Sequence, residues 1–366
     1  KNFGIRPPSA KTSKPLWTKR SAPTSTSGKP VDVPRALSHT LPMRSTDSPL
    51  LSHKAALDLS GLIAQKALGE TTVDVGFSSN VFMVFGLPTR RLVGNPAFWT
   101  KESSLCNLSI TRHPKHEIPY GCYARMNQIF IDTEIRSKNT NVIDVGRSFR
   151  EYTNRLGYHD GKANRAILRQ LINYITSVIR VEPSPGNVAP GRMIGLQSMV
   201  ARAWDLHFDV ENPEQLMLAK GQIMLDEMYA SYIHKHAVPL DMNVVHVFKR
   251  NPLALDFYRF LAYRANKLGK LIHFPDHLLF EQLGTEQEED KIVRVRLRHI
   301  LAAIQTYWPV KARFESGEFV LEPSPPAVQH KIPSRKPINI TPVPKPKSEP
   351  SVPPPYDQNL SPKPGG

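Results

Sequence analysis

The chain has 366 residues and a formal net charge of +16, with 48 Lys and Arg against 32 Asp and Glu. This length exceeds one small domain, and the basic charge favours a polyanion or an anionic surface as partner. Two cysteines, Cys106 and Cys122, exclude a disulfide scaffold. No apolar run approaches the length of a membrane span and no secretory signal is evident, so we expect a cytoplasmic protein that does not contact the membrane.

Proline-rich stretches mark both ends of the chain. Residues 1–50 hold 8 of the 34 prolines and residues 323–366 hold 14, together with Ser, Thr and Lys and little that could be buried. Such composition predicts disorder. The expected domains are a basic tail at 1–50, a helix with short strands at 51–118, a first domain at 119–235, a second at 236–322, and a Pro-rich tail at 323–366.

The middle of the chain begins with a helix over 119–137, followed by a short apolar strand at 141–145. Ser148 and Glu151 have the spacing of a capping box and predict the start of a second helix. Gly157 predicts its end, because glycine readily adopts the left-handed conformation of a helix C-terminus.

A longer helix follows and carries the functional prediction. Its apolar stripe is expected to face the core and consists of Leu168, Leu171, Ile172, Ile175, Val178 and Ile179. The outer side is expected to present Lys162, Ala166, Arg169, Gln170 and Asn173, with Arg165 at the border. Residues 191–210 then predict a β-ribbon from which Arg192 and Arg202 reach outward. Helix, strand, helix, helix and ribbon is the order of a winged helix.

The same order recurs about 130 residues later. Asn251 predicts a helix cap with Pro252 at the first helical position, and 270–274 is the short strand. Asp276 is expected to cap the next helix, and Gly284 to end it. The second long helix, 291–308, presents Lys291, Arg294, Arg298 and Gln305 opposite an apolar stripe, and a glycine-centred hairpin at 310–323 carries Lys311 and Arg313. The predicted fold class is therefore α+β, with two tandem winged-helix domains between disordered tails.

This chemistry suits double-stranded DNA. An α-helix fits the major groove, where Arg, Lys, Asn and Gln can read base edges, and basic residues on the ribbons can contact phosphates. The candidate DNA-binding residues are Lys162, Asn164, Arg165, Arg169, Asn173, Arg192, Arg202, Lys291, Arg294, Arg298, Lys311 and Arg313. No catalytic residue, metal ligand or cofactor is predicted, because the sequence has no P-loop and its Cys and His spacings match no common site.

Several motifs resemble those of the RepA family of bacterial plasmid replication initiators. They are "IPYGCYAR" at 118–125, "IDVGRSFREYTNRLG" at 143–157, "HAVPLD" at 236–241, "ALDFYRFLAYR" at 254–264 and "LEPSPPAV" at 321–328. The resemblance spans about residues 86–328. It implies a bacterial protein that binds repeated sequences at a plasmid origin, helps open the duplex, and brings in the host initiator and helicase.

The resemblance also implies tandem winged helices and exchange between a monomer and a homodimer, with plasmid copy control as a consequence. Two alternatives remain from the residues alone. One is a winged-helix transcription repressor, and the other is a metal-dependent enzyme that nicks DNA during replication.

Overall fold

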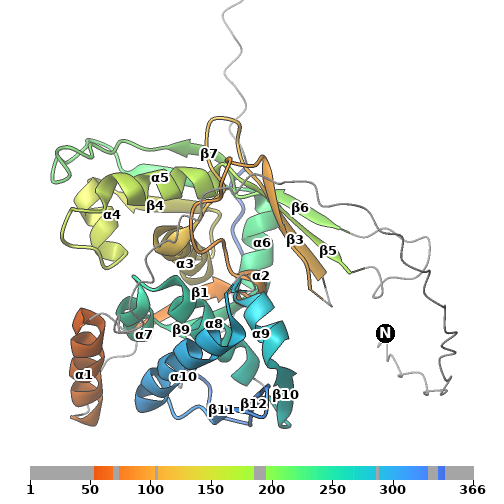
Figure 1. Ribbon diagram of the computed structural model, residues 1–366. Coiled ribbons are helices and arrows are strands. Elements are labelled where there is room, and N and C mark those ends of the chain that lie inside the picture. The colour runs from red at the N-terminus through yellow and green to blue at the C-terminus, as the bar shows by residue number, and fades with distance from the viewer. Residues whose placement is uncertain are drawn as a thin grey trace, which may run out of the picture. The chain divides into compact units, whose positions relative to one another are not determined.

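The structure is a computed structural model, drawn in Figure 1, and the part of the chain that it describes forms one compact unit. Its described residues are 53–68, 74–103, 106–184, 195–266, 268–285, 288–328 and 337–342. The predicted tail at 1–50 lies outside them. The described part is a mixed α+β fold with several small antiparallel sheets, which confirms the predicted class at that level.

Helices and strands alternate irregularly along the described residues (Figure 1). The helices are α1 (His53–Ala67), α2 (Asn80–Phe85), α3 (Gly121–Lys138), α4 (Phe149–Arg155), α5 (Asn164–Ile175), α6 (Glu227–His236), α7 (Met242–Phe248), α8 (Pro252–Ala265), α9 (Asp276–Gln282) and α10 (Asp290–Tyr307). The strands are β1 (Val75–Ser79), β2 (Phe98–Lys101), β3 (Cys106–Thr111), β4 (Val142–Gly146), β5 (Val178–Pro183), β6 (Leu196–Met199), β7 (Ala201–Asp205), β8 (Gly221–Leu225), β9 (Ala237–Asp241), β10 (Ile272–Pro275), β11 (Ala312–Glu315) and β12 (Glu318–Leu321).

The strands form small sheets whose orders are β1-β9, β2-β3-β5-β6, β4-β8-β7 and β10-β12-β11. Each neighbouring pair in these sheets is antiparallel. Most of the buried apolar side chains of these elements belong to one hydrophobic cluster. Because that cluster is continuous, the helices of the earlier and later parts of the chain are held on a common core.

Local signals in the sequence predicted several helix ends correctly. The Ser148 hydroxyl accepts a hydrogen bond from the Glu151 backbone N–H at 3.1 Å, as expected for the cap of α4. Asn251 caps α8 through the Ala254 N–H at 3.1 Å. Gly157 has a φ of 76°, and a Cβ added there would lie 2.5 Å from the His246 ring. Glycine is therefore required at that position both by its backbone conformation and by the space available.

Asp276 does not cap α9, contrary to the sequence prediction. Pro275 occupies the cap position and makes no side-chain cap, while Asp276 is the first helical residue. Its carboxylate lies 2.5 Å from the Arg294 guanidinium on α10. A buried carboxylate is better compensated by a guanidinium than by backbone N–H groups alone, so the tertiary contact decides where Asp276 points.

Parts of the predicted C-terminal tail pack against the fold, which corrects the expectation of disorder there. Val328 is buried, and the Trp308 indole N–H donates to the Pro325 carbonyl at 2.8 Å. Farther on, the Thr341 N–H donates to the Asn141 side-chain oxygen at 2.8 Å. The remaining predicted tail, residues 329–336 and 343–366, lies outside the described residues.

A buried polar network joins α3 to α8. The Arg125 guanidinium on α3 contacts both carboxylate oxygens of Asp256 on α8, at 2.9 and 2.5 Å. Arg259, one turn along α8, donates to Gln128 on α3 and to Ser78 on β1, each at 2.7 Å. Because the arginine side chains are fully buried, their charges depend on these partners.

The same network continues to Asp132 on α3, a fully buried carboxyl. It accepts hydrogen bonds from the Ser79 backbone N–H at 2.7 Å and from the Tyr229 hydroxyl at 3.0 Å. Tyr229 in turn lies 2.7 Å from the Tyr174 hydroxyl on α5. Burial dominates over these favourable contacts and raises the pKa of Asp132 to about 7.

This raised pKa predicts a specific pH dependence of stability. A carboxyl that holds its proton more tightly in the folded state stabilises the fold below its unfolded pKa of about 3.9, and this contribution is lost as the pH rises through about 7. Between pH 5 and pH 8, we expect the free energy of unfolding of the natural protein to fall by about 2–3 kcal/mol relative to that of Asp132→Asn. Urea unfolding at the two pH values measures the difference, and parallel pH dependences would contradict it.

Candidate nucleic-acid interface

The outer face of α5 presents two arginines to solvent. Arg165 and Arg169 are exposed, and Lys162 is exposed just before the helix. The Arg165 guanidinium lies 2.5 Å from the Glu211 carboxylate, and both side chains are largely exposed. The Arg169 guanidinium donates to the Tyr120 hydroxyl at 3.3 Å. These two guanidinium groups therefore remain accessible to a ligand as large as a duplex.

Two amide side chains predicted for the outer face of α5 are buried instead, as is Asn164, a third amide that was predicted to bind DNA. Asn164 is 7% exposed, Gln170 2% and Asn173 1%. Gln170 accepts the Tyr120 backbone N–H at 2.9 Å, and Asn173 accepts the Glu117 N–H at 3.3 Å. The prediction that Gln170 and Asn173 face outward is wrong, because partly buried backbone N–H groups before α3 need acceptors and these two amides supply them.

The apolar stripe predicted for α5 is partly wrong, because the helix ends earlier than predicted. The helix stops at Ile175, and Val178 and Ile179 belong to β5, so they do not extend the helical pattern. The fully buried apolar residues are Ile167, Leu171, Tyr174 and Ile175, whereas Leu168 and Ile172 are only partly buried. Relative to the expectation, the buried face is rotated toward Gln170 and Asn173.

The ribbon expected at 191–210 does not form as one hairpin. β6 pairs with β5, while β7 pairs with β8 in a different sheet. Arg192 lies outside the described residues. Arg202 on β7 is exposed, and its guanidinium lies 2.8 Å from Asp226 and 3.4 Å from Glu227. Glycine spacing alone could not reveal that neighbouring strands enter separate sheets.

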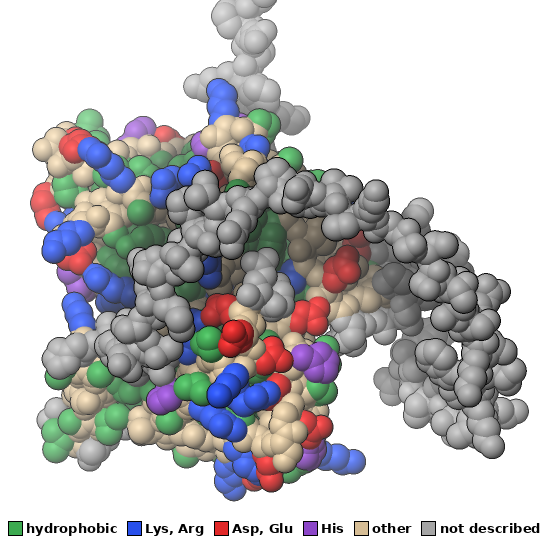
Figure 2. Space-filling view, viewed as in Figure 1, with side chains coloured by type: hydrophobic (Ala, Val, Ile, Leu, Met, Phe, Trp, Pro, Cys, Tyr) green, Lys and Arg blue, Asp and Glu red, His purple; other side chains and the backbone are tan. Residues whose placement is uncertain are grey.

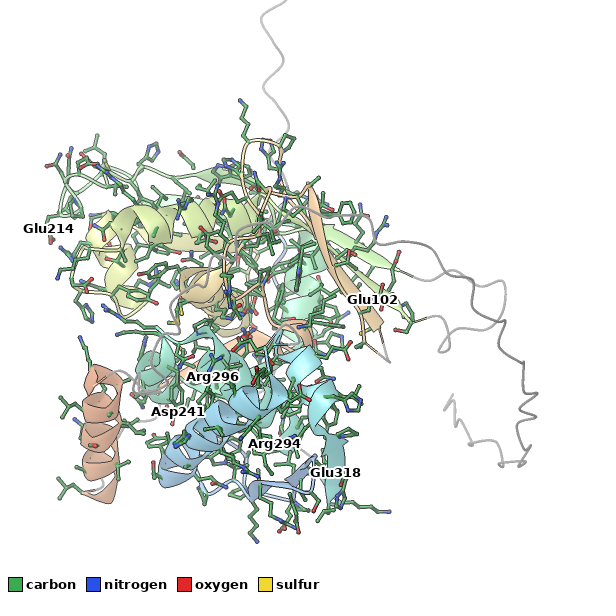
Figure 3. The ribbon with its side chains drawn as sticks, in the orientation of Figure 1. Glu102, Glu214, Asp241, Arg294, Arg296 and Glu318 are labelled. Carbon is green, nitrogen blue, oxygen red and sulfur yellow. The ribbon has the colours of Figure 1, made fainter. Side chains whose placement is uncertain are left out.

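The loop 206–220 between β7 and β8 returns to the ends of α4 and α5. Phe208 stacks on the buried Tyr152 ring with centroids 5.5 Å apart, which anchors the loop. Beyond this anchor, Glu211 pairs with Arg165, and Glu214 lies 2.6 Å from Arg150 on α4. Figure 3 labels Glu214 at the outer edge of this loop, and Figure 2 shows acidic and basic side chains side by side over this region. The loop thus brings the Glu211 carboxylate to the guanidinium of Arg165, a contact that the sequence analysis missed.

The apolar stripe predicted for α10 is buried as expected. Some of the cations predicted to face outward contact other groups of the protein. Lys291 and Arg298 are exposed, and Arg298 donates to the Phe314 carbonyl at 3.4 Å. Arg294 is only partly exposed and is held by Asp276, so the expectation that it faces outward is wrong. Figure 3 shows Arg294 and Arg296 on this helix. Lys291 and Arg298 remain the accessible cations among the predicted residues of α10.

The predicted second hairpin is confirmed as β11 and β12. Ser316 and Gly317 form its two-residue turn, and both have positive φ, the conformation that such turns require. Lys311 and Arg313 are exposed. Arg313 contacts Glu322 and lies 2.9 Å from Glu315, whereas the Lys311 backbone N–H donates to Ser324 at 2.9 Å. The hairpin therefore holds Lys311 in place while its charge faces solvent.

Metal and membrane sites were also sought in the described residues. Within them, no three His, Cys, Asp or Glu side chains are grouped so that they could hold a metal ion. In the same part of the chain, no helix combines the length and the apolar character needed to cross a membrane.

Comparison with known proteins gives a match to one family over part of the chain and two similar crystal structures. No curated protein matches the chain. The crystal structure of selenomethionine derivatives of domains 2 and 3 of RctB is similar with a TM-score of 0.44 and 10% identity, covering 69% of this chain and 97% of that chain. A second crystal structure, of RctB domains 2-3, is similar with a TM-score of 0.44 and 9% identity, covering 67% of this chain and 96% of that chain. Residues 118–273 match the family described as plasmid encoded RepA protein. These residues contain α3, α5 and α8 and most of the motifs named above, and this part of the chain is therefore similar to plasmid-encoded RepA proteins.

Proposed function

We propose that the protein is a plasmid replication initiator that binds repeated sequences at the origin through two winged-helix domains. In this proposal it recruits the host initiator and helicase and has no catalytic centre of its own. The first domain comprises residues 119–235 and the second residues 236–322. The family match over residues 118–273 and the accessible guanidinium groups on α5 support this function over that of a protein that coats nucleic acid without sequence specificity.

The observation that carries the proposal is a strand pairing that occurs twice. In the later part, α8, β10, α9 and α10 precede the β11-β12 hairpin, and β10 pairs with the second hairpin strand. In the earlier part, α3, β4, α4 and α5 precede the β7-β8 pair, and β4 again pairs with the second strand. This shared order and pairing support a winged helix in each part, with β5 and β6 as additions to the first.

This correspondence supports α5 and α10 as the equivalent recognition helices of the proposed domains. In helix-turn-helix proteins the corresponding helix enters the major groove, where arginine can pair with guanine edges. Arg165 and Arg169 on α5, and Lys291 and Arg298 on α10, are the exposed cations placed for that role. Lys162 and Lys311 are suited to phosphates at the borders of the two helices, where they would add salt-dependent affinity.

Nuclease footprinting on the replication region of the plasmid tests the proposal. Protection should appear at direct repeats and leave intervening DNA accessible. Protection confined to a promoter, without repeats or an adjacent AT-rich segment, would favour a transcription repressor. A covalently tailed nick in supercoiled origin DNA with Mg²⁺ or Mn²⁺ would instead favour the nicking enzyme.

The ion pair between Arg165 and Glu211 predicts a measurable restraint on DNA binding. If Arg165 contacts DNA, the duplex must displace Glu211, so Glu211→Gln should tighten binding. The expected gain is up to about fivefold, because exposed ion pairs are weak. Fluorescence anisotropy with a labelled repeat at low salt measures it, and Glu182→Gln, which removes a partly exposed glutamate on β5, serves as the control. Unchanged or weaker binding by Glu211→Gln would show that Arg165 is not the competing contact.

A further inference from the structure

Arg264 near the end of α8 has no anionic partner in the described part of the chain. It is partly buried, and its guanidinium carbon lies 5.5 Å from the ring centroid of Phe260, 5.8 Å from that of Tyr263 and 5.6 Å from that of Phe274. Its Nε is buried, and none of the described residues accepts a hydrogen bond from it. Burial also lowers the pKa of this guanidinium from its usual value. Most partly buried arginines in this fold, such as Arg294, contact a carboxylate.

A cleft of about 470 Å³ opens beside Arg264. Its lining includes Lys235 and His236 from the end of α6, Arg264 and Asn266 from the end of α8, and Asn80 from α2. None of its described lining residues is an Asp or Glu. Residues from two motifs noted in the sequence, "HAVPLD" and "ALDFYRFLAYR", therefore meet at one cationic cleft.

Another explanation is that these cations only stabilise helix ends. α6 and α8 both end at the cleft, and each helix C-terminus carries roughly half a negative charge. Lys235 and Arg264 each bring a full positive charge, which leaves an excess of about one positive charge. Helix termini also do not satisfy the buried Nε of Arg264. The local charge and the missing acceptor both favour an anion in the cleft.

We propose that this cleft binds a phosphate group. The planar guanidinium matches the spacing of phosphate oxygens, a lysine adds a mobile point charge, and the Tyr263 hydroxyl and the amides of Asn80 and Asn266 add neutral hydrogen-bonding groups. The phosphate belongs either to a nucleic-acid backbone or to a small phosphorylated molecule. Phosphate binding by the cleft is independent of the proposed initiator function, and only its assignment to DNA rests on that function.

Titration of the full chain with inorganic phosphate at constant ionic strength tests the site directly. Isothermal titration calorimetry should detect saturable binding that weakens about tenfold or more in Arg264→Gln, because a hydrogen bond to a charged group is lost. Lys235→Gln should also weaken binding. This exposed position tests the cleft independently if Arg264→Gln folds poorly. Lys138→Gln removes the same charge from α3 and should bind phosphate normally.

Absence of saturable phosphate binding, or equal binding by the natural protein and both cleft variants, would overturn the proposal. Acetate binding as tight as phosphate binding would overturn it as well, since the cleft would then select carboxylates. The salt dependence of binding to an unrelated duplex separates the two phosphate sources. A slope of log affinity against log salt that falls by about one unit in Lys235→Gln assigns the cleft to the DNA backbone, and an unchanged slope assigns it to a small phosphate compound.

Discussion

Asp256→Ala is expected to lower the free energy of unfolding by about 3–5 kcal/mol, the usual cost of removing one partner from a buried ion pair. Asp256 is 3% exposed and is the carboxylate that Arg125 and Arg259 share. Without it, two fully buried guanidinium groups lose their anion. Urea unfolding followed by circular dichroism measures the change, and an unchanged slope would show that the compactness of the unfolded state is unaltered.

Asp160→Ala provides the matched control for this prediction. Asp160 also pairs with an arginine, Arg250 at 2.7 Å, but the pair is exposed. Its loss should change stability little, because exposed ion pairs contribute about 0–1 kcal/mol. The double variant Arg125→Met with Asp256→Leu should recover part of the loss, since it removes one of the two uncompensated charges. Equal urea midpoints of unfolding for Asp256→Ala and Asp160→Ala would show that the network between α3 and α8 does not stabilise the fold.

The second large effect concerns DNA. Arg165→Ala combined with Arg169→Ala should weaken binding to an origin repeat by about a hundredfold or more if each arginine reads a base, because one base contact is worth roughly tenfold or more. Both side chains are exposed on α5 and carry no core packing that alanine would remove. Melting temperature should therefore stay close to that of the natural protein, and anisotropy with repeat and random duplexes measures the binding.

The random duplex distinguishes base contacts from phosphate contacts. The arginine double variant should lose affinity mainly for the repeat, whereas Lys311→Ala should weaken both duplexes alike and reduce the salt slope by about one unit. Lys311 is suited to this comparison because its backbone is held by Ser324 and its side chain is exposed. Equal losses on both duplexes for the double variant would limit α5 to phosphate contacts.

Short-range patterns allowed many elements to be predicted. The cap at Ser148, the turn at Gly157, the Asn251-Pro252 start of α8 and the Ser316-Gly317 hairpin depend on residues within four positions of one another. Such features need no knowledge of distant contacts, because the backbone conformation and the nearest hydrogen-bonding groups determine them. The apolar stripe of α10 was equally readable, since a helix of 18 residues displays its period over several turns.

Side chains that serve distant backbone groups could not be assigned in the same way. The sequence predicted that Gln170 and Asn173 face outward. In the structure, their side-chain oxygens accept hydrogen bonds from backbone N–H groups in the segment before α3. Pairing of β7 with β8 rather than β6 likewise joins residues separated by a long loop. In both cases the deciding partner lies outside the window over which a sequence period can be recognised.

The sequence by itself determined the basic charge, the repeated order of elements, and the motifs shared with the RepA family, because each is a property of composition or of neighbouring residues. Only the tertiary structure decided which cations are accessible: Arg165 and Arg169 face solvent, Arg294 is held by Asp276, and Arg264 lines a cleft whose described lining residues include no carboxylate. The physical reason is that burying a charged side chain is costly without a counter-charge, and that partner can come from any point along the chain.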